Sequence, residues 1–418
     1  MVVADFPLWT LLPFPLLVLA LALLPSLVPN YWERPSVQLA VSLACASPVA
    51  AYELMNARSD LLVHALGGYA TFVITLGALF TISGGVELSA NLRATPKTNL
   101  LFLLTGALLA SFVGTTGASM LLVRPFLKLN RERKERQHLV PFFILIVANV
   151  GGLLTPLGDP PLLLGYIDGV PFWWTLRLLP IWLLYVGSLS AAFYGYERRS
   201  FAAEPSSAES LAGSERERFA LRGKRNLLLL AAVAPAALLP GGVREAVLIG
   251  LSAASYFTTE RTIHRANSFG FAPLVELALI FFGLFSCLGP IEHTLAEVAP
   301  RLPVQRAWQL FWGSGLLSSV LDNAPTYAAF LALARGLTAH ASALVAGVDP
   351  IRLAAISAGS VVMGASTYIG NGPNLLVKAI AERERYSLPS FARYALFAFT
   401  LMLPTHLLMS AALYWLEH

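Results

Sequence analysis

A run of helix-breaking residues lies inside an apolar segment that is long enough to cross a bilayer. Between Asn149 and Leu164 the segment contains three prolines, three glycines and one carboxylate, Asp159. Each proline removes a backbone donor and clashes with the preceding turn, so a continuous helix is excluded here. Broken helices at membrane depth are tolerated where their free backbone groups face protein or a cavity. We therefore expect the free backbone groups and Asp159 to face a cavity rather than lipid.

The same stretch recurs later in the chain. Gly152–Leu164 and Gly364–Leu376 share the pattern G-x-x-T-x-[L/I]-G-[D/N]-x-P-x-L-L. A second pair of segments, Ser111–Ala118 and Ser318–Pro325, precedes the two copies in the same order and at similar spacing. Such self-similarity indicates an internal duplication.

The composition is that of a membrane protein. The 418 residues are 56% hydrophobic and 13% charged, with a mean hydropathy of +0.66, whereas a soluble chain carries about 25% charged residues. Two cysteines, Cys45 and Cys287, lie in apolar segments and exclude a disulfide framework. Basic loops beside a membrane explain the net charge of +5, so no nucleic-acid partner is expected.

Apolar runs of about 20 residues predict membrane-spanning helices. Two apolar runs, 98–128 and 306–334, have a polar break that leaves each half too short to cross a core about 30 Å thick, and we interpret them as re-entrant hairpins. Segments 140–165 and 349–381 exceed the length of one span, as broken helices would. We predict an all-α polytopic membrane protein of about ten transmembrane helices, at residues 7–28, 36–54, 61–83, 140–165, 172–196, 224–240, 243–258, 269–288, 349–381 and 390–414.

The order of these segments predicts two inverted repeats, each with one hairpin and one broken helix. Repeat 1 covers residues 61–196 and repeat 2 covers 269–418. Five crossings separate their starts, so the repeats insert in opposite senses, which is typical of secondary transporters. Three segments lie outside the repeats. We interpret them as scaffold helices in 1–60, a polar cytoplasmic linker in 197–223 with no chemistry of its own, and connecting helices in 224–268.

The basic residues support this topology. One predicted side of the membrane collects 21 of the 29 Lys and Arg residues and the other collects seven, with Lys378 left inside the membrane. By the positive-inside rule the rich side is cytoplasmic, which leaves both termini on the extracytoplasmic side. The run Asn130–Arg136 is interpreted as a solvated loop. The first apolar run lacks a basic leader and is expected to span the membrane rather than to be cleaved.

Three ionisable groups lie at membrane depth, where such groups are rare and usually functional. Asp159 is a candidate cation or proton site, and its alternative role is to cap the second half of its broken helix. Asp322 and its neighbour Asn323, at the second hairpin tip, offer hard oxygen ligands for sodium, again with capping by Asp322 as the alternative. Lys378 either neutralises one carboxylate or extends toward the cytoplasm.

Charge separates two classes of substrate. Transporters of this design usually bind anions with half-helix N-termini and neutral side chains. Here Asp159 and Asp322 place a carboxylate in each half of the site, while Thr115 and Thr116 at the first tip add hydroxyl oxygens without charge. Two fixed negative charges repel a dicarboxylate and favour a monovalent cation. Burial favours the protonated form of a carboxylate, so a proton and a cation can compete for it, which is sufficient for exchange.

These motifs resemble those of the ion-transporter superfamily, which contains NhaD-type sodium/proton antiporters, arsenite permeases and citrate or dicarboxylate symporters. The resemblance runs from about Gly77 to Tyr414, and the chain is similar in particular to a bacterial branch labelled sodium:proton antiporter or citrate transporter. Dicarboxylate symporters carry Ser-Asn-Thr at each hairpin tip. This chain has Gly114–Thr116 and Leu321–Asn323 instead, which favours the antiporter and arsenite-permease side.

The resemblance implies one site built from both repeats. Asp159 and Asp322 would be the exchanging carboxylates, and the other candidate residues are Thr115, Thr116, Asn149, Thr155, Gly158, Asn323, Ser366, Thr367, Gly370, Asn371 and Asn374. Sodium is expected near Thr115, Thr116, Gly158 and Asp159, and near Asp322, Asn323 and Gly370. Na⁺ and H⁺ would be transported or coupling ions, with no resident cofactor. The family also implies a homodimer, an elevator-like motion of one part against a scaffold, and a place in the bacterial inner (plasma) membrane.

The first interpretation is a sodium/proton antiporter, and not an enzyme, with small ions and the lipid bilayer as partners. The alternative is a sodium- or proton-coupled symporter of citrate, a dicarboxylate or another small anion. An arsenite permease is less favoured because nothing suggests thiol coordination. An intramembrane aspartyl protease needs Gly-x-Gly-Asp, whereas Pro156–Asp159 lacks the first glycine. A receptor that does not transport would leave the duplicated broken helices unexplained.

Overall fold

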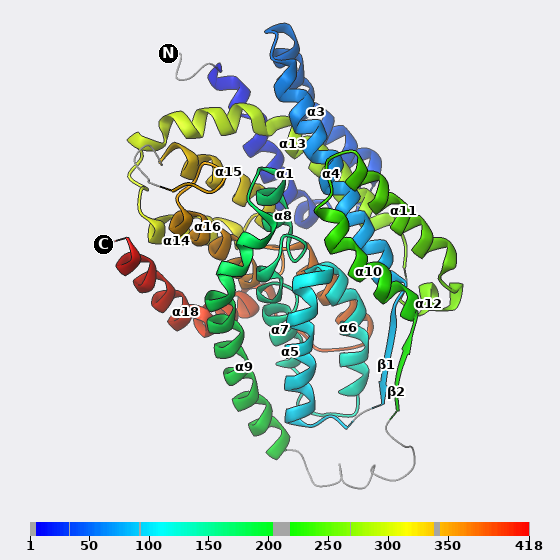
Figure 1. Ribbon diagram of the computed structural model, residues 1–418. Coiled ribbons are helices and arrows are strands. Elements are labelled where there is room, and N and C mark those ends of the chain that lie inside the picture. The colour runs from blue at the N-terminus through cyan, green and yellow to red at the C-terminus, as the bar shows by residue number, and fades with distance from the viewer. Residues whose placement is uncertain are drawn as a thin grey trace.

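Helices dominate the computed structural model, which describes residues 6–32, 34–91, 93–203, 218–267, 269–337 and 343–417 (Figure 1). Seven helical segments in these ranges are long and apolar enough to span a bilayer: Leu8–Pro25, Pro35–Met55, Ser59–Gly84, Pro96–Val113, Phe172–Ala202, Ala272–Arg301 and Phe391–Leu416. The shorter apolar segments Leu139–Leu154 and Pro350–Ser366 belong to the predicted broken helices. The expectation of an all-α polytopic membrane protein is confirmed.

The elements follow one another as η1 Leu8–Leu11, α1 Pro13–Leu27, α2 Pro29–Trp32, α3 Pro35–Met55, α4 Ser59–Gly84, β1 Glu87–Asn91, α5 Pro96–Val113, α6 Thr115–Leu129, α7 Leu139–Ile146, η2 Val150–Leu154, α8 Pro160–Ile167, η3 Phe172–Leu178, α9 Leu179–Ala202, β2 Arg218–Arg222, α10 Lys224–Ala237, α11 Val243–Thr258, α12 Arg261–Ala266, α13 Ala272–Val298, η5 Ala299–Arg301, α14 Ala307–Ser318, α15 Asn323–Gly336, α16 Pro350–Met363, η6 Gly364–Ser366, α17 Gly372–Arg383 and α18 Phe391–Leu416. The η elements are 3-10 helices.

Two helix pairs reverse where hairpins were predicted. α5 and α6 reverse at Gly114, whose φ of +82° is accessible to glycine without strain. α14 and α15 reverse across residues 319–322 and have 12 and 14 residues, so at about 1.5 Å per residue neither could cross a core about 30 Å thick. α5 has 18 residues, which makes it longer than predicted and comparable with a single span.

Two helices are broken where the duplicated motif predicts. In repeat 1, α7 continues through η2 to non-helical residues 155–159 and then α8, and in repeat 2, α16 continues through η6 to residues 367–371 and then α17. A proline in the first turn of both α8 and α17 suits a helix start, where the missing N–H has no intrahelical partner. The residues that follow η2 and η6 have the same extended backbone conformation: Thr155 has φ −136° and ψ 159°, and Thr367 has φ −136° and ψ 164°.

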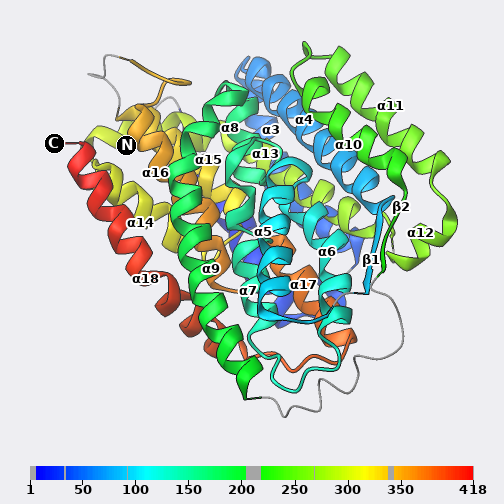
Figure 2. The same cartoon turned by 60° about the horizontal axis from the view of Figure 1, so that its bottom comes forward.

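Four helices follow the two hairpin reversals and the two broken turns, namely α6, α8, α15 and α17. They form two pairs that extend from the centre toward opposite ends of the molecule (Figure 1, Figure 2). α8 packs beside α15, and α6 beside α17, so each pair takes one helix from each repeat. Arg335 joins the outer ends of the first pair at 3.3 Å from Asp168, and the Tyr386 hydroxyl joins those of the second by donating to the Leu127 carbonyl at 2.7 Å. All four helix N-termini therefore point toward the centre.

A further group of helices packs against one side of these pairs. α13 contacts α3 and α4, and it also contacts α15. A Cβ on Gly283 of α13 would lie 2.8 Å from Leu17 and 3.0 Å from Ser42, which shows how closely α1, α3 and α13 approach. α10 and α11 pack on α4 but have 14 and 16 residues, shorter than ordinary spans. The total of about ten membrane-spanning helices therefore stays a prediction.

The predicted linker contains a strand. Residues 197–202 continue α9, residues 204–217 lie outside the described residues, and β2 pairs antiparallel with β1 so that Arg222 lies opposite Glu87. The Arg222 guanidinium also contacts the carboxylates of Glu87 at 3.1 Å and Glu260 at 2.8 Å. The linker is therefore helical at its start, in residues 197–202, and residues 218–222 form a strand because β1 supplies an edge with which they can pair.

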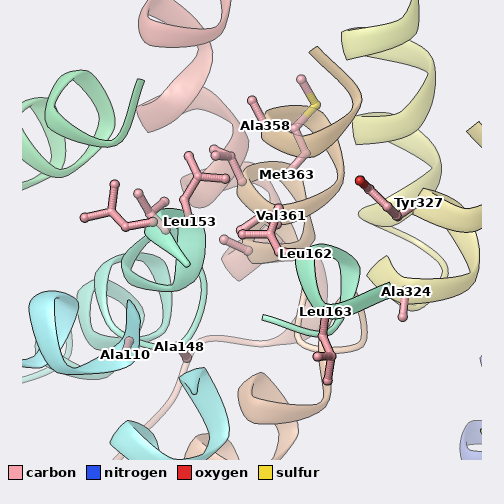
Figure 3. Close-up of a cluster of buried hydrophobic side chains, with 14 of the residues drawn as sticks. Ala110, Ala148, Leu153, Leu162, Leu163, Ala324, Tyr327, Ala358, Val361 and Met363 are labelled. Carbon is pink, nitrogen blue, oxygen red and sulfur yellow. The ribbon is translucent and has the colours of Figure 1, made fainter. Parts of the chain in front are cut away.

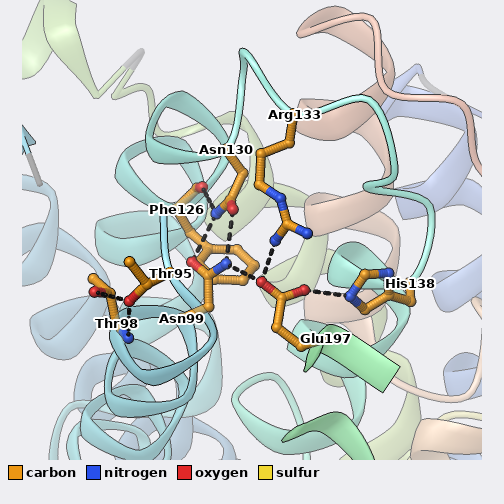
Figure 4. A network of polar contacts seen from close by, with 8 residues as sticks. All are labelled: Thr95, Thr98, Asn99, Phe126, Asn130, Arg133, His138 and Glu197. Carbon is orange, nitrogen blue, oxygen red and sulfur yellow. Dashed lines mark hydrogen bonds and ion pairs between the residues drawn. The ribbon is translucent and has the colours of Figure 1, made fainter. Parts of the chain in front are cut away.

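A buried ionic network closes one end of repeat 1 (Figure 4). The Glu197 carboxylate, 0% exposed, is paired with Arg133, accepts a hydrogen bond from Asn99 at 2.7 Å, and lies 2.6 Å from His138 Nε2. Asn99 in turn exchanges amide hydrogen bonds with Asn130. These contacts fasten α5, α9 and the loop between α6 and α7 together. The expectation of a merely solvated basic loop is therefore wrong for Arg133, because a buried carboxylate needs a counter-charge.

Packing around the meeting point of the helices is apolar (Figure 3). Leu163 of α8, Ala324 of α15, and Val361 and Met363 of α16 are all buried there. In such surroundings each polar group depends on a protein partner, because unpaired burial is costly. The polar side chains at the four helix N-termini must therefore satisfy one another.

Candidate functional site

Side chains from the four helix N-termini meet around a single carboxylate. Asp159 and Asn371 immediately precede α8 and α17, and neither side chain caps its own helix. Thr115 and Asn323 are the first residues of α6 and α15. All four are at most 1% exposed. The hairpin tips and broken turns, distant in sequence, thus form one centre to which both repeats contribute.

The Asp159 carboxylate is the acceptor for the other three side chains. Its Oδ1 accepts hydrogen bonds from the Thr115 hydroxyl at 2.7 Å and from Asn371 Nδ2 at 3.3 Å, and its Oδ2 accepts one from Asn323 Nδ2 at 2.5 Å. The Thr115 backbone N–H also donates to the Gly158 carbonyl at 2.8 Å. Every hydrogen-bond partner of this carboxylate within the described ranges is a neutral group.

Two further asparagines form a chain of amides behind Asn371. Asn371 Nδ2 donates to Asn149 Oδ1 at 3.1 Å, and Asn149 Nδ2 donates to Asn374 Oδ1 at 2.7 Å. Asn374 Nδ2 ends the chain on the carbonyls of Gly364 and Thr367, at 3.0 and 2.8 Å. Asn149 and Asn374 are both 0% exposed, so the chain links repeat 1 with repeat 2 through the interior.

Glycines allow each broken turn to fold closely onto itself. A Cβ on Gly158 would overlap the Gly152 carbonyl oxygen, and a Cβ on Gly370 would lie 2.5 Å from the Gly364 carbonyl oxygen. The two pairs occupy the same positions of the duplicated motif. Gly158 and Gly370 were predicted near sodium, and the structure gives both a backbone role, since only glycine fits these close approaches.

Thr155 and Thr367 hold the broken turns against the hairpins. The Thr155 hydroxyl donates to the Ser111 carbonyl, and the Thr367 hydroxyl donates to the Ser319 carbonyl at 2.5 Å. Both threonines also accept a hydrogen bond from a backbone N–H of their own turn. These contacts give the two threonine hydroxyls a structural role in this conformation, and neither is among the hydrogen-bond donors to Asp159.

The same contacts correct the alignment of the hairpin tips. Ser111 lies four residues before Thr115, and Ser319 lies four residues before Asn323. In the structure Thr115 therefore corresponds to Asn323. The sequence alignment of Ser111–Ala118 with Ser318–Pro325 pairs Thr115 with Asp322 instead. The difference arises because the sequence alignment pairs Ser111 with Ser318, whereas the contacts with Thr155 and Thr367 pair Ser111 with Ser319. The missed signal is a serine four residues before each helix start.

Asp322 lies at the edge of the centre and caps α15. Its Oδ1 accepts a hydrogen bond from the Ala324 backbone N–H at 3.0 Å, and its side chain is half-buried. This is the capping role that the sequence left open as an alternative. Asp159 shows the reverse, because it makes no cap with α8 and is fully buried. The two carboxylates therefore have different environments.

Three other predicted residues lie outside the contacts of Asp159. The Lys378 ammonium is 2.8 Å from Glu382, one turn further along α17, with 32% of the Lys378 side chain exposed. The counter-charge of Lys378 in this conformation is Glu382, and the compensation of an aspartate by Lys378 stays a prediction. Thr116 is half-buried beside Thr115. Ser366 is buried, and its hydroxyl has no hydrogen-bond partner within the described ranges.

The arrangement is suited to binding small ions. Each helix N-terminus carries about half a positive charge, and four together stabilise negative charge at the centre. Asp159 supplies that negative charge, with neutral donors around it. The Asn323 Oδ1 atom is buried without a hydrogen-bond partner in the described residues, so it is one further oxygen beside the carboxylate.

These features define a class: a multi-pass membrane protein whose duplicated broken helices and hairpins converge on one polar centre, which is the architecture of secondary transporters. Comparison with known families narrows the class. The chain belongs to the family described as "Putative citrate transport", which matches residues 3–414. No curated protein matches the chain. The family confirms the resemblance to the citrate transporter-like branch, and it does not separate antiport from symport.

Proposed function

We propose that this protein is a sodium/proton antiporter in which Asp159 binds the two ions alternately. The observation that supports this most strongly is that Asp159 is a buried carboxylate whose partners, among the described residues, are all neutral. Such a carboxylate exchanges a proton for a sodium ion without changing the charge of the site. The oxygens of Thr115 and Asn323 add hard ligands of the kind that sodium prefers.

Competition for one carboxylate supplies the coupling. Asp159 without a proton or a cation would be a charge in apolar surroundings, which is unfavourable. The helices that carry the site would therefore move between the two sides of the membrane when Asp159 holds a proton or a sodium ion, and would not move when it holds neither. In the elevator-like motion that we propose, α6, α8, α15 and α17 move against α1, α3, α4 and α13, and the boundary at α13 and α15 is where they would slide.

A symporter of citrate or another small anion is the second candidate. The description of the family favours it. The four helix N-termini also favour it, because such termini bind anionic substrates in other transporters. In that mechanism Asp159 and Asp322 would bind the coupling ion, and the anion would lie beside them.

Proton flux in proteoliposomes tests the choice. The purified protein is reconstituted with a pH dye inside, and sodium, lithium, potassium or citrate is added outside. Sodium-driven proton flux that is lost in Asp159→Asn, in the absence of any organic anion, supports the antiporter. Sodium-dependent entry of labelled citrate, with no proton flux on sodium alone, supports the symporter and contradicts the proposal.

We also propose that the protein forms a homodimer in the bacterial inner membrane, with both termini outside. Single cysteines placed near each terminus and labelled with an impermeant reagent test the orientation. Mass measurement of the detergent-solubilised protein tests the dimer, and a monomer would contradict it.

A further inference from the structure

The amides near Asp159 have hydrogen-bond directions that can be read from their backbone contacts. A side-chain amide has one acceptor oxygen and one NH₂ donor, whereas a backbone carbonyl only accepts. An amide that contacts a backbone carbonyl therefore presents its nitrogen there. This rule fixes the direction of every bond in the chain from Asn374 to Asn371.

The chain is fixed at its far end. Asn374 Nδ2 contacts two carbonyl oxygens of the broken turn at 3.0 and 2.8 Å, so its Oδ1 must face Asn149. Asn149 Nδ2 then donates to that Oδ1 at 2.7 Å and to the Ile144 carbonyl at 2.8 Å. The remaining atom of the Asn149 amide, its Oδ1, must face Asn371 as an acceptor.

Asn371 is consequently held as a donor. Its Nδ2 contacts Asn149 Oδ1 at 3.1 Å, the Ala148 carbonyl at 3.3 Å and Asp159 Oδ1 at 3.3 Å. Turning this amide over would place its oxygen against acceptors. The Thr115 hydroxyl adds a second donor to the same oxygen. Oδ1 of Asp159 is thus committed to donors.

Oδ2 of Asp159 has a different neighbour. Asn323 Nδ2 donates to it at 2.5 Å, while Asn323 Oδ1 is buried without a partner in the described residues. Asn323 therefore lacks the backbone carbonyl contact that fixes the other three asparagines. Rotation of its terminal amide breaks only the bond to Oδ2, and that torsion is soft in asparagine.

We propose that the proton and the competing cation bind at Oδ2 of Asp159, that the Asn323 amide turns over to meet them, and that Asn149 is a positioning residue that keeps Asn371 a donor. This rests on the exchange proposed above. An ionised Oδ2 accepts the Asn323 N–H. A protonated Oδ2 donates its O–H to Asn323 Oδ1, and a sodium ion there meets the same Oδ1. The proton comes from water and returns to it, and no other covalent bond changes.

Asn149→Leu tests the positioning role, because leucine has a similar volume and no hydrogen-bonding atoms. Asn371 then keeps one fixed acceptor, the Ala148 carbonyl at 3.3 Å, and is held less firmly as a donor to Asp159. The pH midpoint of exchange is expected to rise by about one unit, which corresponds to about one hydrogen bond to a charged group. Asn226→Leu is the matched control. Asn226 is also a buried asparagine, and its amide donates to the Gly85 carbonyl and the Thr259 hydroxyl, but it lies outside the site.

Asn323 is tested by two variants. Asn323→Leu removes both the donor and the acceptor, so exchange is expected to be lost at every pH. Asn323→Thr keeps a hydroxyl that either donates or accepts, as Thr115 does in repeat 1, and is expected to retain exchange. Exchange by Asn323→Leu at the wild-type rate would overturn the proposed turning of the amide.

Infrared difference titration of the Asp159 carboxyl in the purified full chain, with Asp159→Asn for subtraction, gives a second readout that needs no transport. The expected result is a midpoint about one unit higher in Asn149→Leu and unchanged in Asn226→Leu. An unshifted midpoint in folded Asn149→Leu overturns the positioning role, even if the wild type exchanges sodium for protons. A shifted midpoint in a protein that does not exchange these ions overturns the proposed function instead and leaves the positioning role standing.

Discussion

Repeat 1 and repeat 2 build nearly the same backbone and place their charges at different positions. The broken turn carries Asp159 in repeat 1 and Asn371 in repeat 2, each just before the helix that follows. The hairpin tip carries Gly114 in repeat 1 and Asp322 in repeat 2, again just before a helix. One carboxylate is therefore buried among side chains of both repeats, and the other caps a helix at the edge.

The duplicated motif therefore specifies the shape of the backbone rather than the chemistry of the site. Threonine, glycine and proline at matching positions shape both broken turns, whichever residue stands between them. The residue before α8 or α17 is then free to be a carboxylate or an amide. Function in such a fold depends on the few side chains that differ between the repeats.

The largest effect is expected from Asp159→Asn, which makes the two broken turns alike at this position. Sodium-driven proton flux should fall to the level of protein-free vesicles, because no exchangeable group remains at the centre. The side chain is isosteric, so the variant should still fold, which a thermal unfolding curve checks. Wild-type flux from the folded variant would show that the two turns do not differ in function.

Exchanging the residues at positions 159 and 371 tests whether the two broken turns are interchangeable. The double variant Asp159→Asn with Asn371→Asp should not recover flux, because position 371 faces the acceptors Asn149 Oδ1 and the Ala148 carbonyl. We expect the free energy of unfolding of the double variant to be about 1–3 kcal/mol lower than that of Asp159→Asn alone, because these acceptors are left unsatisfied. Recovered flux would mean that the repeats are interchangeable.

Alanine substitutions test the shared backbone. Gly158→Ala and Gly370→Ala should each destabilise the protein by about 1–3 kcal/mol, because the new Cβ meets a carbonyl oxygen of the same turn. Gly158→Ala should have the larger effect, since its Cβ comes closer. Gly372→Ala is the control, with nothing within 4 Å of a Cβ. Equal thermal stability in all three variants would contradict the close approach.

A smaller effect is expected at the edge of the centre. Asn is as good an N-cap as Asp, so Asp322→Asn should leave stability within about 0.5 kcal/mol, whereas Asp322→Ala should lose about 1 kcal/mol. Flux should fall less in Asp322→Asn than in Asp159→Asn. A complete loss of flux in folded Asp322→Asn would move the exchanging carboxylate to repeat 2.

The smallest effect is expected from Lys378→Met. Lys378 pairs with a half-exposed glutamate, and such pairs contribute about 0–1 kcal/mol. The matching position of repeat 1 is Tyr166, which is uncharged. The rate of sodium-driven proton flux and the thermal unfolding temperature should both stay near the wild-type values. A change in the sodium dependence of the flux would show that Lys378 reaches the site in another conformation.

The sequence predicted the shape of the site better than its contacts. Helix breaks are local, since glycine and proline act on their own turn, so the breaks at Asp159 and Asn371 could be predicted. The contact of Asp159 with Asn323 could not, because it depends on the packing of four helices from segments 164 residues apart. The burial of Glu197 was also missed, since a charged residue beside a basic segment has the pattern of a solvated surface.

In the proposed mechanism a proton and a sodium ion compete for Asp159. The most direct measurement is proton release when sodium is added to the purified protein in weakly buffered solution containing a pH indicator. At a pH below the midpoint of exchange, where Asp159 carries a proton, we expect roughly one proton released per sodium ion bound, because the ligand must be deprotonated, and no release from Asp159→Asn. Sodium binding without proton release, or unchanged release from the variant, would contradict it.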